Sequence, residues 1–370
     1  NMSAASVVER QLLNGSRITV KTKQLVQLSG GSVTCVQASR DELSDRVTVA
    51  YGSGTHSTAT SVLLYDLHSD RRRQSLDVEA ATRAVVPLNV SFGHVSSVEL
   101  HSDFSSNRLL LATQLGASRP GVAHLMQMDP AGSLIRQTWQ PCRNGSVWCG
   151  SMSIVSPSSS SSSVSVVLGT TRRATVYEQR ESRWHARHLF TDSSDVLACR
   201  FMASPSVVVS GARDGRLRVF DMRASHTHPP HGTHAPTSMR QTTAVSSVVV
   251  ELDNCVLASD MHGVVRRWDL RTGRYFHEWT DLANADRVDA SFCASGNDVR
   301  APLPHAAHLV LCANKVRARS SLYFAAGVDY SKPIASVDAV SSPITGVALL
   351  DQHHFVVASH GTLAFHQLKI

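Results

Sequence analysis

Two stretches of the chain, VVVSGARDGRLRVFDMR (207–223) and CVLASDMHGVVRRWDLR (255–271), align with each other without a gap. Each begins with Val and Leu residues, passes through small residues, turns at a glycine and ends in an aromatic residue followed by Asp-x-Arg. Such runs on either side of a glycine turn are typical of an antiparallel hairpin. The repeat limits the fold more than any other feature, because a unit that recurs at this spacing indicates stacked or circularly arranged copies.

A further strand-like run precedes each hairpin, and RYFHEWT (274–280) follows the second. Four strands in about 40–50 residues are the period of a propeller blade. Weaker copies cover most of the chain, with groups of strands beginning near positions 32, 94, 146, 195, 244, 288 and 344. The last group has only three strands, and SRITVKT (16–22) is left over. We therefore predict an all-β, seven-bladed β-propeller whose ring is closed by this N-terminal strand.

The predicted propeller is a single domain over residues 16–370. The chain begins at Asn1 rather than Met, so we interpret residues 1–15 as an N-terminal segment that ends a missing extension. Long polar loops are expected at 156–165, 225–241 and 296–306.

The composition indicates an intracellular globular protein. Hydrophobic residues make up 42% and charged residues 18% of the chain, enough for a sizeable core. The seven cysteines form no Cys-x-x-Cys pair, which favours reduced, buried thiols in the nucleus, the cytoplasm or an organelle. No apolar run reaches the ~18 residues of a membrane helix, so no membrane partner is expected. The basic run Arg71–Arg73 favours a solvated loop over a contact with phosphate or an acidic partner.

Neither metal binding nor catalysis has a convincing motif. His226, His228, His231 and His234 lie in a Pro-rich stretch without a companion Cys or carboxylate cluster, which favours a surface loop over a metal site. The motifs of serine hydrolases, phosphate-binding loops, zinc proteases and dinucleotide folds are all missing from the sequence. We expect a non-enzymatic protein with no metal, no cofactor and no small-molecule substrate.

The two hairpins resemble the blades of the WD-repeat β-propeller family. In that family a Gly-His pair before a blade, a Ser or Thr, the Asp of the hairpin turn and the Trp at the strand end form a structural network. The positions that match are Gly93, His94, Ser210, Asp214, Trp268 and Phe220, the last standing where the family has Trp. Most blades lack the Gly-His pair, so the network is expected only in part.

Two interpretations remain open for the Asp-x-Arg ends. Asp221 and Asp269 are suited to accept hydrogen bonds from turn amides and from a nearby Arg, which would make them local structural locks. Arg223 and Arg271 recur at the same place in two successive blades, however. A pair of arginines on one face is also suited to bind an acidic or carbonyl-rich surface of a partner. All four residues are therefore candidates for partner binding.

The stretches SDVLACRFMA and ASDMHGVVRRWDLRTG resemble the WD-x-Arg-box substrate receptors of cullin–RING ubiquitin ligases, especially their factor-four-type members. The resemblance implies a protein–protein interaction scaffold whose box docks a propeller-type ligase adaptor, with a cullin as a further partner. The alternative is an architectural WD-repeat subunit of a large ribosomal, ribosome-maturation or ciliary assembly, which the pI of about 9.2 and the long loops would suit. Direct RNA contact is the weakest possibility, because the sequence has no basic-aromatic stripe.

Overall fold

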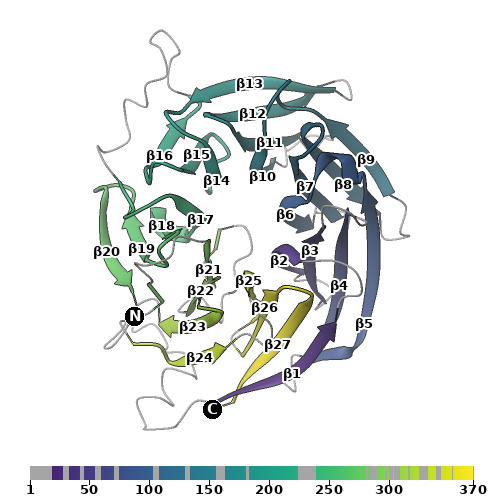
Figure 1. Ribbon diagram of the computed structural model, residues 1–370, viewed down its shortest axis with the longest axis vertical. Coiled ribbons are helices and arrows are strands. Elements are labelled where there is room, and N and C mark those ends of the chain that lie inside the picture. Colours follow the sequence, from purple (N-terminus) through teal and green to yellow (C-terminus); the bar gives the residue numbers. More distant parts are fainter. Residues whose placement is uncertain are drawn as a thin grey trace.

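Seven antiparallel sheets are arranged around a common central axis (Figure 1). The computed structural model describes residues 19–27, 33–41, 46–54, 60–70, 75–102, 108–129, 134–155, 163–180, 183–223, 239–280, 282–283, 290–296, 298–299, 303, 309–315, 317–324, 332–338, 343–351 and 353–369. The prediction of a seven-bladed β-propeller is confirmed. Among the described residues, no helix is long and apolar enough to cross a membrane.

The sheets are numbered as blades in chain order. Blade 1 contains β2 (Val33–Asp41), β3 (Arg46–Ser53), β4 (Thr60–Asp70) and β5 (Ser75–Leu88), and blade 2 contains β6 (Val95–Ser102), β7 (Arg108–Gly116), β8 (Pro120–Met128) and β9 (Leu134–Trp139). Blade 3 contains β10 (Val147–Val155), β11 (Ser163–Thr170), β12 (Arg173–Arg180) and β13 (Arg183–Thr191), and blade 4 contains β14 (Val196–Phe201), β15 (Val207–Ala212) and β16 (Leu217–Asp221). Blade 5 contains β17 (Val245–Val250), β18 (Cys255–Asp260), β19 (Val265–Asp269) and β20 (Arg274–Trp279), and blade 6 contains β21 (Ser291–Ser295), β22 (Leu309–Asn314), β23 (Arg319–Phe324) and β24 (Ala335–Asp338). Blade 7 contains β25 (Ile344–Leu349), β26 (His354–Ser359), β27 (Thr362–Lys369) and, from the other end of the chain, β1 (Thr19–Gln27); two 3-10 helices, η1 (Val90–Phe92) and η2 (Leu252–Asn254), lie between strands.

The position of a strand within its blade determines its burial. The second strands β18, β22 and β26 are buried along their whole length, because each is covered by a neighbouring blade on both faces. In the outer strands, no residue of β9 is buried, and Trp279 alone is buried in β20. Continuous Val, Leu and Ala runs therefore mark the inner strands, and mixed polar and aromatic runs mark the outer ones.

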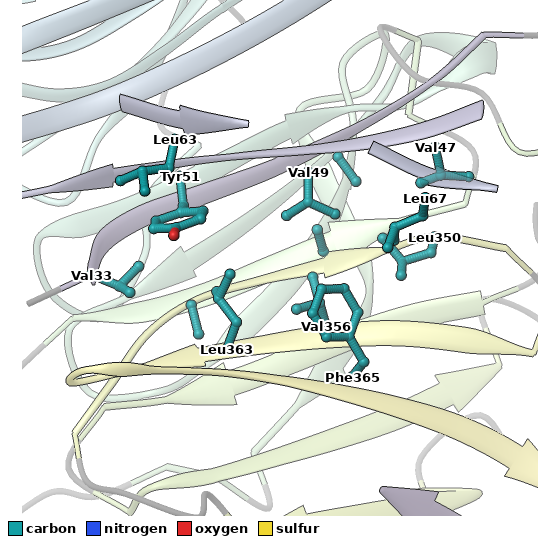
Figure 2. Packing of buried hydrophobic residues seen from close by; sticks show 13 residues of the cluster. Val33, Val47, Val49, Tyr51, Leu63, Leu67, Leu350, Val356, Leu363 and Phe365 are labelled. Atoms are coloured by element: carbon teal, nitrogen blue, oxygen red, sulfur yellow. The ribbon is translucent and has the colours of Figure 1, made fainter. Parts of the chain in front are cut away.

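The hydrophobic core is divided into clusters that join one blade to the next. Figure 2 shows the cluster between blades 1 and 7, where Val49 and Tyr51 of β3 face Leu363 and Phe365 of β27. Glycines of second strands allow this close approach. A Cβ on Gly52 would lie only 2.5 Å from Cγ1 of Val95, the first residue of blade 2. Burial of these apolar side chains between the sheets stabilises the ring.

The ring is closed by the N-terminal strand, as predicted. β1 pairs antiparallel with β27, in a register from Thr19 opposite Lys369 to Gln27 opposite Thr362. The described strand runs on to Gln27, beyond the predicted end at residue 22, whereas residues 16–18 of the prediction lie outside the described residues. The assignment of 16–370 to one domain and of 1–15 to an extension stays a prediction, because residues 1–18 lie outside the described residues.

Blade 4 differs from the four-strand expectation, since three strands form its sheet among the residues that the structure describes. The Leu217 N–H donates to the Met239 carbonyl at 2.9 Å, and the Gln241 N–H donates to the Gly215 carbonyl at 2.8 Å. The short segment 239–241 therefore borders β16 in the place of a fourth strand. The four histidines of the predicted metal-or-loop stretch lie outside the described residues, as do Arg71–Arg73.

Candidate functional site

Both Asp-x-Arg ends adopt the same backbone turn. Asp221 ends β16 and Asp269 ends β19, the third strands of adjacent blades. An Oδ1 atom of Asp221 accepts the Arg223 N–H at 2.9 Å, and Oδ1 of Asp269 accepts the Arg271 N–H at 2.8 Å. Each carboxylate therefore holds the backbone two residues ahead of it, in an Asx-type turn.

The same carboxylates also orient the arginine side chains. Arg223 donates from Nε to Oδ1 of Asp221 at 2.9 Å and from Nη2 to Oδ2 at 2.7 Å. Arg271 makes the matching pair of bonds to Asp269, both at 3.1 Å. The hydrogen bonds from these arginines lower the pKa values of Asp221 and Asp269 below their usual range. The two forks are charge-assisted and geometrically defined.

The arginines nevertheless remain largely exposed, with 68% of the Arg223 side chain and 73% of the Arg271 side chain accessible to solvent. Equivalent strands of neighbouring blades run in the same direction, so both side chains lie on one face of the ring. The carboxylates therefore hold both turns locally, and both guanidinium groups remain open to solvent; partner binding by these four residues stays a prediction.

Apolar residues anchor each turn to the core beneath it. Met222 packs against the cluster between blades 3 and 4, and Leu270 packs against the cluster between blades 4 and 5. The Phe220 ring stacks on Phe190 of β13 with centroids 4.4 Å apart, whereas the rings of Trp268 and Tyr275 form a T-shaped pair with centroids 5.3 Å apart. In each turn the apolar residues face the core while the Asp and the Arg between and after them face outward, because successive side chains of a strand point to opposite sides.

The six residues expected to contribute to WD-type networks lie in three different blades. Gly93 and His94 immediately precede β6 in blade 2, whereas Asp214 lies in the β15–β16 turn of blade 4. Among the described residues, the buried Ser210 hydroxyl and the Trp268 Nε1 have no hydrogen-bond partner. Phe220 has no ring N–H to contribute to such a network.

Asp214 instead bonds to its own turn and to arginines. Desolvation raises its pKa, but hydrogen bonds from the Arg218 side chain, the Arg216 N–H and the Ser193 hydroxyl outweigh it, so that the pKa falls to about 2. Oδ2 of Asp214 accepts from Arg218 Nη2 and from Ser193 Oγ, both at 2.9 Å. The residue is therefore ionised and serves the local structure of its turn.

Sequence reasoning missed the carboxylate that organises the hairpin of blade 5. Asp260 is fully buried and accepts four backbone N–H groups: those of His262 and Val264 at 3.0 Å, Thr242 at 3.1 Å and Thr243 at 3.3 Å. It occupies the place that Ala212 has in the gapless repeat alignment. A single charged residue among Ala and Ser at the end of an apolar strand was the signal that could have identified it.

A second buried carboxylate was also missed, and its arginine partner lines the central channel of the ring. Glu99 of β6 is fully buried, and its Oε2 lies 3.1 Å from Nη1 of Arg200 on β14. The channel has a cavity of about 200 Å³ lined by first strands of the blades. The thiols of Cys149 and Cys199 lie 3.3 Å apart at its wall, and their hydrogen bond and burial raise the pKa of Cys199 well above its usual value. This thiol is protonated, so it is poorly suited to act as a nucleophile.

Within the described ranges, no group of three or more His, Cys, Asp and Glu side chains could hold a metal ion. The fold defines the class of this chain: it is a seven-bladed β-propeller. No protein-family model matches it.

Two curated relatives show local similarity. The chain is 29% identical over 98 residues to DDB1- and CUL4-associated factor 4 of Bos taurus, and 31% identical over 99 residues to DDB1- and CUL4-associated factor 4 of Homo sapiens. Each match covers 26% of this chain and 19% of the relative. The chain therefore spans about a fifth of the length of the curated relatives it matches.

Proposed function

We propose that this chain is a substrate receptor of a cullin–RING ubiquitin ligase, and that Arg223 and Arg271 dock it on the ligase's adaptor. The observation that carries the proposal is the matching hydrogen-bond pattern of the two exposed arginines in adjacent blades. Both curated relatives are named for association with DDB1 and CUL4. We therefore take DDB1 as the adaptor and CUL4 as the cullin of the proposed complex.

The hydrogen-bonded forks give these arginines a physical advantage as binding residues. An arginine on a free surface loses much side-chain freedom when it binds, and this loss weakens the complex. Here Asp221 and Asp269 restrict the side chains before any partner arrives. Arginine has five N–H donors in a fixed fork, so a guanidinium that already bonds to a carboxylate is still able to donate to acceptors of a partner.

The test is capture of DDB1 and CUL4 by the purified full-length protein carrying Arg223→Glu and Arg271→Glu. We expect capture to fall at least about tenfold, because the reversed charges repel an acceptor-rich surface. Arg216→Glu is the matched control: Arg216 is 58% exposed and ion-paired to Asp214, but it lies at the opposite end of β16. Equal capture by the double variant and the wild type would refute the docking role. Recovery of a stoichiometric large particle without DDB1 would favour an architectural subunit instead.

A further inference from the structure

The outer edge of blade 5 exposes two adjacent aromatic rings beside one of the docking arginines. Tyr275 is 48% and Phe276 is 44% exposed, although both belong to β20. β20 is the last strand of its sheet and lies at the rim of the ring (Figure 1). Arg271 lies in the turn that connects β19 to this strand, so the rings and the guanidinium group belong to one hairpin.

A β-bulge accounts for two consecutive exposed rings. In the register of the hairpin, Arg267 lies opposite His277 and Trp268 lies opposite Tyr275, so Phe276 is an extra residue without a partner in β19. A bulge breaks the strict alternation of a strand and redirects side chains. It also twists the edge, which makes the addition of a partner strand to β20 unfavourable. A partner is therefore expected to bind the side chains rather than the strand edge.

Each ring lies against the guanidinium of a neighbouring arginine that is itself ion-paired. The Arg266 guanidinium lies 4.8 Å from the centre of the Tyr275 ring, and the Arg267 guanidinium lies 5.3 Å from the centre of the Phe276 ring. Arg266 is ion-paired to Glu278 and Arg267 to the buried Glu251, each at 2.6 Å. Cation–π contacts of this kind orient the rings before binding, which lowers the entropic cost of association.

The charges of the hairpin indicate the chemistry of its partner. From Arg266 to Glu278 the strands and their turn contain four arginines and only two carboxylates. The excess of positive charge lies at the turn of the β19–β20 hairpin, where Arg271 and Arg274 are both exposed. Aromatic residues and arginine are the residue types that dominate binding energy at interfaces.

We infer that Tyr275 and Phe276 insert into an apolar hollow with an acidic rim on the same adaptor that Arg223 and Arg271 bind. The inference rests on the proposed function and extends its docking face from two arginines to the outer edge of blade 5. The rings supply apolar contact area, and Arg271 and Arg274 pair with the acidic rim.

The experiment measures the affinity of the full-length protein for purified DDB1. We expect the double variant Tyr275→Ser, Phe276→Ser to bind at least about tenfold more weakly than the wild type. Ile135→Ser is the matched control, because Ile135 is 61% exposed on β9, the outer strand of another blade. Thermal unfolding verifies that each variant is folded. If the double variant unfolds, Phe276→Asp replaces it, since this residue lies at the bulge and its new charge would repel an acidic rim.

The outcomes separate the inference from the proposed function. If the aromatic variants and the arginine variants both bind weakly, the result supports the inference and the proposed function. Unchanged binding by the aromatic variants, together with loss in Arg223→Glu, Arg271→Glu, overturns the inference and leaves the proposed function standing. Loss in the aromatic variants alone overturns the role of the arginine pair but supports the aromatic surface. No binding of DDB1 by the wild type overturns the proposed function and the inference with it.

Discussion

Gly211 of β15 lies directly against Val245, the first residue of β17 in the next blade, so that a Cβ on this glycine would overlap the valine side chain. The same relation joins Gly52 to Val95 between blades 1 and 2. Glycine at this place in a second strand lets the next blade approach closely. The spacing between blades therefore depends on single missing methyl groups.

Replacing Gly211 with Ala should destabilise the protein. Overpacking of a close contact typically costs about 1–3 kcal/mol, because neighbouring side chains or strands must shift. Chemical denaturation measures the change in the free energy of unfolding. In the double variant Gly211→Ala, Val245→Ala, the shorter side chain makes room for the new methyl group, so the two effects should be less than additive. Full additivity would show that the two residues do not constrain each other.

Acid should weaken the closure of the ring through His366. This residue of β27 is almost fully buried, and its Nδ1 lies 3.3 Å from Oγ1 of Thr22 on the closing strand β1. Burial lowers the pKa of His366 from 6.5 to about 4 in the folded protein. Between these pH values the unfolded chain binds the additional proton, so the free energy of unfolding falls as the pH falls. Once the pH is below the pKa of His366 in the folded protein, the free energy of unfolding has fallen by its full amount, about 3 kcal/mol.

The measurement is denaturant unfolding at several pH values between 7 and 4 for the wild type and for His366→Asn. The variant should have a flatter pH dependence, because asparagine does not titrate in this range. Part of the slope should remain, since burial also lowers the pKa of His124 to about 4. An identical slope in the wild type and His366→Asn would contradict the assignment.

Replacing Asp260 with Ala should cost about 3 kcal/mol or more. The buried carboxylate accepts four backbone N–H groups, which the variant would leave without an acceptor in the interior. Asp214→Ala is the comparison, because the Asp214 side chain is 25% exposed and water is able to replace it. Unfolding in urea measures both variants. If Asp260→Ala and Asp214→Ala lost the same free energy of unfolding, burial of Asp260 would not increase the cost of its lost hydrogen bonds.

The local repeat was sufficient to predict the architecture. The gapless match of 207–223 with 255–271 and the three-strand ending near position 344 led to the correct number of blades and to the closing strand. Both depend on the order of strands along the chain, which a sequence records directly. The C-terminal end of β1 was predicted too early, because the edges of a strand depend on the pairing partner more than on its own residues.

Contacts between distant residues were not predictable in the same way. Glu99 and Arg200 are separated by a whole blade in the sequence, and nothing near either residue indicates the other. The bulge at Phe276 likewise depends on how β20 pairs with β19, so the exposure of both rings could not be read from RYFHEWT.

The sequence by itself therefore determined the all-β class, the repeated four-strand unit, the closure of the ring and the twin Asp-x-Arg ends, because strand periodicity and turn residues act over short distances. Only the tertiary structure decided that Asp221 and Asp269 lock arginines that remain exposed, that Ser210 and Asp214 do not share a network, and that Asp260 is the carboxylate that organises the hairpin of blade 5. Burial and hydrogen-bond partnership depend on which blades face each other, and that relation exists only once the ring has closed.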